Sequence, residues 1–90
     1  MAQQKTEHLL SGFLFKGTDS FTIWPVDLGE AHIFSAYPVW GSLGAEFLVK
    51  NIRYQRYQEN NANRWRVNFE VENMTGPGVA YELFWTRIFQ

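Results

Sequence analysis

The chain of 90 residues has room for one domain with one core, and its net charge of −1 gives no general attraction to nucleic acid or to an anionic membrane. It contains no cysteine, which excludes disulfides and thiolate metal sites, and it has no run of about 18 apolar residues that would span a bilayer. Its aromatic fraction of 18% is high, and because each aromatic side chain buries about 150–250 Å², even a short domain can build a core from them.

The first third of the chain predicts short strands separated by turns. Residues 1–6 are polar and are expected to be frayed, and no apolar signal-peptide core is visible, so we expect a cytoplasmic protein if the chain is complete. Apolar residues alternate weakly along 8–15 and more clearly along 21–24 and 31–37, with turn residues at 17–20 and 27–30. The last two of these strands each stop at a proline, which cannot donate a hydrogen bond to a sheet.

A longer strand is predicted for residues 46–57. Its apolar positions change parity between Val49 and Ile52. A change of parity within one strand indicates an extra residue or a change of sheet, so we expect either a β-bulge near residues 50–51 or a strand that passes from one sheet to another.

The clearest signal is the strand at residues 64–71, in which Trp65, Val67, Phe69 and Val71 alternate strictly with polar side chains. A turn at 60–63 precedes it, a looser loop at 73–78 follows it, and residues 79–89 form the last predicted strand. The loop contains Asn73-Met74-Thr75, which fits the glycosylation acceptor pattern but is interpreted as loop sequence, with the modification of Asn73 left open.

The turn at 60–63 predicts a register for the hairpin around it. In that register Glu59 lies opposite Arg64 and Arg53 lies opposite Glu70, which pairs two arginines with acids. It also sets Tyr54 opposite Phe69 and Ile52 opposite Val71 on the apolar face. For the following hairpin, the register that keeps the apolar residues inward pairs Trp65 with Trp85, Val67 with Leu83, and Phe69 with Tyr81.

These elements predict an all-β, single-domain antiparallel β-sandwich of six or seven strands, without a helix, over residues 1–90. Its expected core is Phe13, Phe15, Ile23, Phe47, Val49, Ile52, Tyr54, Trp65, Val67, Phe69, Val71, Tyr81, Leu83 and Trp85.

The end of the chain resembles the closing hairpin of small immunoglobulin-like, cell-adhesion-type bacterial β-sandwich domains. The resemblance rests on residues 68–76 (Asn-Phe-Glu-Val-Glu-Asn-Met-Thr-Gly) followed by Tyr-Glu-Leu-Phe-Trp at 81–85, about the last third of the chain. It implies an immunoglobulin-like fold and a role as a binding, adhesion or spacer module, and it carries over no catalytic residue. The Cys…Trp…Cys pattern of antibody domains is absent.

Motifs for catalysis or cofactor binding are absent from the sequence. The two histidines, His8 and His32, have no metal-ligand spacing, no nucleophile motif surrounds any serine, and no glycine-rich phosphate loop is present. We therefore expect no cofactor and no enzymatic activity. Convergence of acidic side chains in three dimensions, as in a small hydrolase, stays open because a sequence does not show it.

The distribution of charge has one uneven stretch. Residues 50–66 hold five basic side chains (Lys50, Arg53, Arg56, Arg64 and Arg66) against one acid, Glu59, with aromatic residues between them. Arginines among exposed aromatic rings can bind single-stranded nucleic acid. Because the predicted register pairs two of these arginines with acids and turns Tyr54 and Trp65 inward, we expect no nucleic-acid partner and no membrane insertion.

The last strand gives the leading hypothesis about function. Its outward positions include Phe84, Thr86 and Ile88, and apolar residues on a wet face indicate that something covers them. The segment 9–15 could do so within one chain, but we favour a second copy that contacts the face or the edge of this strand. The leading hypothesis is a non-catalytic binding or assembly module that forms a homo-oligomer and can take a protein ligand.

A second hypothesis is a small carbohydrate-binding, lectin-like domain. Three aromatic residues outside the expected core, Trp24, Tyr37 and Trp40, are its candidate contacts with a glycan.

Overall fold

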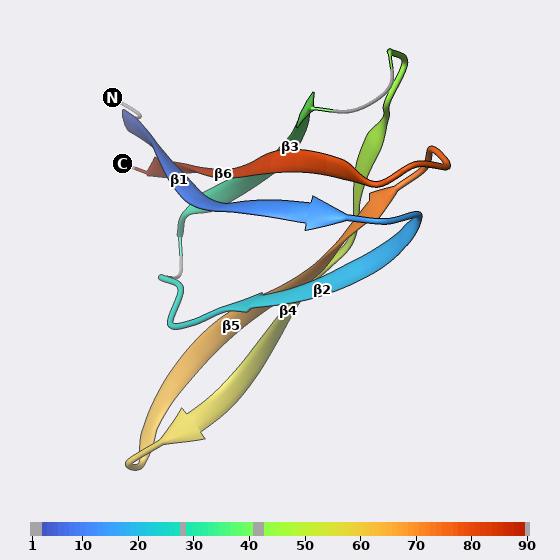
Figure 1. The fold of residues 1–90 in the computed structure, drawn as a ribbon. Coiled ribbons are helices and arrows are strands. Elements are labelled where there is room, and N and C mark those ends of the chain that lie inside the picture. The colour runs from blue at the N-terminus through green and yellow to red at the C-terminus, as the bar shows by residue number, and fades with distance from the viewer. Residues whose placement is uncertain (1–2, 28, 41–42, 90) are drawn as a thin grey trace.

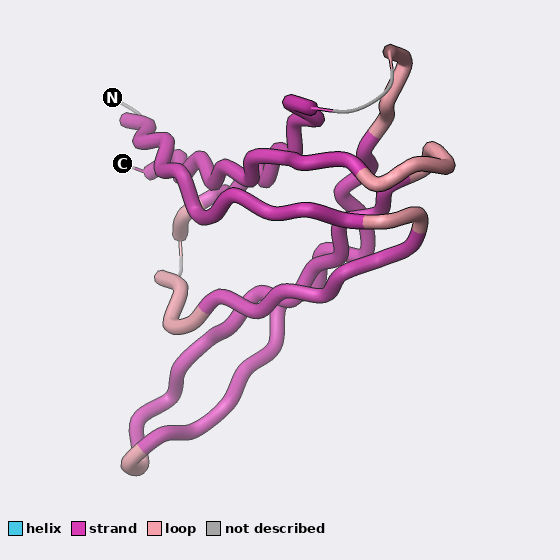
Figure 2. The backbone as a smooth tube through the Cα atoms, in the orientation of Figure 1, coloured by secondary structure: helices cyan, strands magenta, loops and turns pink. Residues whose placement is uncertain are grey.

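Six strands make up most of the chain. The computed structural model describes residues 3–27, 29–40 and 43–89, apart from the side chain of Trp40. In chain order the strands are β1 (Gln3–Leu14), β2 (Gly17–Ile23), β3 (Ala31–Trp40), β4 (Phe47–Glu59), β5 (Ala62–Asn73) and β6 (Val79–Phe89). The described residues contain no helix (Figure 2), so the prediction of an all-β chain is confirmed for them.

The strands form two antiparallel sheets of three, in the orders β1-β6-β3 and β2-β5-β4. Figure 1 shows the chain passing from one sheet to the other at every connection except the β4–β5 hairpin. The start of β1 lies beside the end of β6, with Gln3 opposite Phe89. Residues 3–6, expected to be frayed, are therefore part of a paired strand.

The inner faces of the two sheets share one core. The ring of Phe34 on β3 stacks on that of Phe69 on β5 with 4.1 Å between centroids, and the rings of Phe47 and Tyr81 lie 4.9 Å apart. Buried residues come mainly from the two central strands, because only these have a neighbour on both sides and a sheet opposite. The buried hydrophobic side chains are Val26, Phe34, Val67, Phe69, Val71, Val79, Tyr81, Leu83 and Trp85.

The predicted core is right along β5 and β6 and wrong at four positions. Phe13 and Phe15 are 58% and 71% exposed, because β1 turns the opposite set of residues inward, including Leu14 and Gly12. A Cβ on Gly12 would lie 2.8 Å from the Tyr81 ring, so a glycine is required for this close approach.

Ile52 and Tyr54 are the other two predicted core residues that are exposed, at 44% and 53%. Both belong to β4, an edge strand, and Ile52 lies within the bulge, so their side chains keep much of their surface in water. Figure 1 shows that the β4–β5 hairpin extends beyond the other sheet toward its turn.

The β4–β5 register differs from the prediction by two residues. The turn is the two-residue pair Asn60-Asn61, with φ of 51° and 64°, as in a type I′ hairpin. Glu59 therefore pairs with Ala62, and Arg53 lies opposite Asn68 instead of Glu70. The expected bulge is confirmed, because the register shifts between Lys50 and Arg53.

The predicted pairing of β5 with β6 is wrong, because these strands lie in different sheets. The loop after β5 carries the chain across, so side chains expected side by side along a hairpin face each other through the core instead. The predicted faces of β6 are right: Tyr81, Leu83 and Trp85 are buried, and Phe84 points outward. β6 is the central strand of its sheet, so contact of a second copy with the edge of this strand, one of the two expected modes, is also wrong.

Proline at position 38 does not end β3, which continues to Trp40. β3 is an edge strand, where a missing N–H donor is tolerated, and its pairing with β6 becomes irregular between Pro38 and Trp40.

Candidate binding surfaces

The outer face of the β1–β6–β3 sheet, called here the β6 face, carries all three residues proposed for self-association. Pairing of β6 with both neighbours sets His8 and Ser35 beside Phe84, and Thr6 and Ile33 beside Thr86. The face consists of Gln4, Thr6, His8, Ser11, Phe13, Ala31, Ile33, Ser35, Tyr37, Ala80, Glu82, Phe84, Thr86 and Ile88.

The centre of the β6 face is aromatic and shallowly hollowed. The Phe84 ring lies 5.2 Å from the His8 ring and 5.7 Å from the Tyr37 ring, measured between centroids. Beside them is a hollow of about 330 Å³ lined by Thr6, Ser35, Tyr37, Phe84 and Thr86. Phe84 is half-buried by these neighbours, whereas Ile33 and Tyr37 are 51% and 54% exposed.

The segment 9–15 does not cover this face. It belongs to β1 and lies beside β6 within the same sheet, so the prediction that it could shield Phe84 and Ile88 is wrong.

One polar cluster on the β6 face joins β1 to β6. The Ser11 hydroxyl donates to Glu82 Oε2 over 2.6 Å, and His8 Nε2 contacts the same oxygen. The hydrogen bond from Ser11, and then that from His8, lowers the pKa of Glu82 below its usual 4.5. Serine, histidine and glutamate meet here, but the Glu82 carboxylate and the Ser11 hydroxyl both contact Nε2 of His8. In a catalytic triad the acid and the hydroxyl contact different nitrogens of the imidazole ring.

The outer face of the other sheet has a depression of about 430 Å³ lined by Thr22, Trp24, Tyr57 and Arg66, called here the Trp24 depression. The Arg66 guanidinium lies over the Tyr57 ring, 4.2 Å from its centroid. Trp24 is 60% exposed. Tyr57 and Arg66 were not proposed as site residues, and their spacing from Trp24 in the sequence gives no signal that the sheet brings them together.

The arginines of the β4–β5 hairpin form no ion pair with any described acid. The observed register sets Arg53 opposite Asn68 and Arg66 opposite Gln55, so the charge pairs expected from the sequence are absent among the described residues. Of the basic residues at 50–66, only Lys50 has a carboxylate partner in this part of the structure, Glu72 at 2.8 Å. That hydrogen bond raises the pKa of Lys50.

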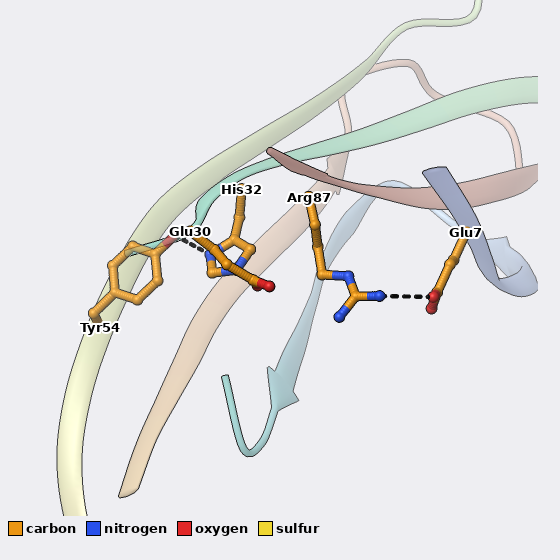
Figure 3. A network of polar contacts seen from close by, with 5 residues as sticks. All are labelled: Glu7, Glu30, His32, Tyr54 and Arg87. Atoms are coloured by element: carbon orange, nitrogen blue, oxygen red, sulfur yellow. Dashed lines mark hydrogen bonds and ion pairs between the residues drawn. The ribbon is translucent and has the colours of Figure 1, made fainter. Parts of the chain in front are cut away.

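A polar network links the two sheets at the end where the hairpin diverges (Figure 3). His32 Nδ1 lies 2.8 Å from the Tyr54 hydroxyl, and His32 Nε2 lies 3.2 Å from Glu30 Oε2. Next to them, Arg87 donates to Glu7 over 3.2 Å. The sequence shows none of this, because its members come from four strands and a loop.

The chemistry of this network is that of an inter-sheet connection. The His32 side chain is 1% exposed and both of its ring nitrogens have partners, so neither is free to exchange a proton with a substrate. Burial raises the pKa of Tyr54, which keeps its hydroxyl protonated. A cavity of about 210 Å³ adjoins the network and includes Asp27 and Trp65 in its wall.

Asn73 is the buried polar residue of the described chain, with no exposed surface. Its Nδ2 donates to the carbonyl oxygens of Leu14 and Pro77, and its Oδ1 accepts from the backbone N–H and hydroxyl of Thr75. This side chain therefore holds the crossing between the sheets, and its amide is not accessible for glycosylation in the folded state.

The aromatic residues proposed for glycan contact do not converge. Trp24 lies on the outer face of β2–β5–β4 and Tyr37 on the β6 face, so the two rings are on opposite sides of the paired sheets. The side chain of Trp40 lies outside the described residues.

The described residues hold no group of three His, Cys, Asp or Glu side chains that could bind a metal ion. No helix among them is long and apolar enough to cross a membrane.

Comparison with models of protein families, with curated proteins and with solved structures finds no match for this chain.

Proposed function

We propose that the protein is a non-catalytic binding and assembly module that forms a homo-oligomer through the β6 face. The observation that carries the proposal is the apolar outer side of a central strand: Phe84 and Ile88 point away from the core, beside the exposed Tyr37. Exposed apolar side chains grouped on one face mark interaction surfaces, and burying the part of them that is still in water stabilises an interface by about 25 cal/mol per Å².

Charge supports a second copy of the chain as the partner. Glu82 is the one acid on the described part of the face and is bonded to Ser11 and His8 of the same chain, and no lysine or arginine lies on this part, so the face offers little charge for an oppositely charged partner. In a symmetric dimer the same patch meets itself, which the aromatic centre of this face around Phe84 and Tyr37 allows.

We further propose that the architecture is an immunoglobulin-like β-sandwich. Strand order supports this proposal. β5 lies between β2 and β4, and β3 lies beside β6, which matches the B-E-D and C-F neighbours of immunoglobulin domains. β1 lies on the other side of β6, where such domains have their last strand. Domains of this type mostly bind or connect other molecules.

The non-catalytic part of the proposal rests on the two histidines. At His8 the acid and the serine share one nitrogen, and at His32 both nitrogens are occupied. Neither arrangement provides a base beside an accessible nucleophile.

Light scattering behind a sizing column tests the assembly. The wild-type protein is expected to have a mass above the 10.6 kDa of one chain, and Phe84→Glu is expected to lower it toward that value while the β-type circular dichroism stays intact. The glutamate would place an unpaired charge in the interface, which desolvation disfavours.

Leu48→Glu is the matched control. Leu48 is 40% exposed and belongs to β4, where it pairs with Glu72 of β5, so it lies on the sheet that does not carry the β6 face. It should keep the wild-type mass. A wild-type protein that stays at 10.6 kDa at high micromolar concentration contradicts the proposal.

A further inference from the structure

We infer that the Trp24 depression binds an acidic carbohydrate, with a uronic-acid ring stacked on Trp24 and its carboxylate held by Arg66. The depression is on the sheet opposite the β6 face, so this inference is independent of self-association. Its volume of about 430 Å³ falls within the range of about 300–1,000 Å³ that small-molecule sites occupy.

The first step of the argument is the cation. Arg66 is held in place by the Tyr57 ring, 4.2 Å below its guanidinium, and it makes no salt bridge with a described acid. Its Nε is buried and has no hydrogen-bond partner among the described residues, and the same is true of the Tyr57 hydroxyl. Unpartnered polar groups beside a depression favour a ligand that supplies acceptors, and a carboxylate forms the strongest hydrogen bonds with a guanidinium.

The register adds positive charge around this point. Arg53 and Arg64 point to the same side of the sheet as Arg66. Arg64 is the preceding outward residue on β5, and Arg53 is on β4, opposite the following outward residue. Neighbours of this kind on a sheet face lie about 7–8 Å apart, so Arg53 and Arg64 add positive charge near the depression that Arg66 lines.

The second step is the ring. Trp24 is 60% exposed and lines the same depression as Arg66. A flat indole at the rim of a polar site offers an apolar surface on which the C–H face of a sugar can pack.

The third step is the set of neutral polar groups. The Thr22 hydroxyl donates to Asn68 Oδ1 over 2.6 Å, which fixes both side chains. The Asn68 Nδ2 donor and the lone pairs of the Thr22 hydroxyl have no partner among the described residues. A fixed donor and acceptor pair beside a stacking surface complements the hydroxyl groups of a sugar.

Single-stranded nucleic acid fits the depression less well. Such sites stack successive bases on several rings along a basic groove. Here Tyr57 is covered by Arg66, which leaves Trp24 as the open ring among the residues that line the depression. Beyond Asn68, the outward positions on β5 are Glu70 and Glu72, whose negative charges repel an extended polyphosphate.

Isothermal titration calorimetry on the full chain tests the inference. The probe is a short oligogalacturonate, compared with the same oligosaccharide after full methyl esterification and with a short oligothymidylate. Esterification removes the charge and keeps the rings, so affinity is expected to fall about tenfold or more. Trp24→Ala and Arg66→Gln should each weaken binding of the uronate by a similar factor.

Arg56→Gln is the matched control for charge. Arg56 lies opposite Trp65, on the other face of the same hairpin, so its loss should change affinity by no more than about twofold. Circular dichroism verifies that Arg66→Gln is folded, and Trp24→Ala tests the site separately because it removes an exposed side chain.

Four results overturn the inference: a wild-type protein that does not bind the uronate at low salt, equal affinity for the ester, equal losses in Arg56→Gln and Arg66→Gln, or tighter binding of the oligothymidylate. Equal losses would indicate diffuse attraction to the basic hairpin. Tighter binding of the oligothymidylate would assign the surface to nucleic acid.

Discussion

Asn73 shows how much of this fold depends on one polar side chain. It has no exposed surface, and its four hydrogen bonds connect the end of β1, the loop at 74–78 and the end of β5. Asn73→Ala leaves buried carbonyl and N–H groups without partners, and each such group costs about 1–3 kcal/mol. We expect the free energy of unfolding to fall by about 3 kcal/mol or more. Urea denaturation followed by tryptophan fluorescence measures it.

The control for Asn73→Ala is Asn63→Ala. Asn63 is exposed and accepts one hydrogen bond of 3.3 Å from Gln58, so its loss should cost about 0.5 kcal/mol or less. Equal losses in the two variants would show that the buried hydrogen bonds of Asn73 do not stabilise the crossing.

At the scale of single residues, alternation in the sequence predicts side-chain direction but not burial. Val67 and Phe69 are inward and buried as predicted, whereas Tyr54 is inward by parity and still 53% exposed. The difference is coverage by the opposite sheet, which depends on where the other strands end. The Trp24 depression was missed for the same reason, since Trp24 and Tyr57 meet only through the pairing of β2 and β4 with β5.

The pairing of β1 with β6 should depend on pH through Glu82. The pKa of Glu82 is lowered in the folded state by Ser11 and His8, so the folded protein binds fewer protons at this carboxyl group than the unfolded chain does. The stabilisation is present above the usual pKa of 4.5 and is lost as the pH falls through the lower folded value. Melting temperatures at neutral pH and below pH 4 should therefore differ more for the wild type than for Glu82→Gln.

A parallel decrease in both proteins would show that other groups cause the acid sensitivity. Hydrogen exchange of the β1 amides, measured in acid, adds a local readout. Protection factors, which correct for the intrinsic exchange rate at each pH, should fall in β1 of the wild type at a higher pH than in β5, because β5 lies in the other sheet.

At the scale of strands, the sequence predicts the elements better than their partners. β2 begins at Gly17, so the turn predicted at residues 17–20 is wrong, whereas the other five strands overlap their predicted positions. The bulge between Lys50 and Arg53 is where the parity of apolar residues changes. The β4–β5 register was wrong because four turn residues were assumed where a two-residue turn with positive φ suffices. The β5–β6 pairing was wrong because a five-residue loop can either close a hairpin or cross between sheets, and alternation is the same in both cases.

The two sheets act as one folding unit because their contacts are distributed along the molecule. Phe34 stacks on Phe69 in the middle, Phe47 packs on Tyr81 toward one end, and His32 bonds to Tyr54 at the other. The connections also alternate between the sheets at all but one step, so neither sheet can form from a continuous segment. Unfolding should therefore be a single cooperative transition.

The bond between His32 and Tyr54 tests this coupling of the sheets. Tyr54→Phe removes the hydroxyl that bonds a buried imidazole nitrogen, so it leaves His32 Nδ1 without that partner and should lower the free energy of unfolding by about 1–3 kcal/mol.

Tyr57→Phe on the same strand is the matched control, because the Tyr57 hydroxyl is buried without a partner among the described residues, and its removal should be neutral or stabilising. Thermal and urea denaturation, monitored by far-ultraviolet circular dichroism and tryptophan fluorescence, should show one coincident transition for each variant, at lower denaturant only for Tyr54→Phe. Equal midpoints for the two variants would mean that the hydrogen bond contributes nothing to holding the sheets together, and separate transitions would mean that the sheets unfold independently.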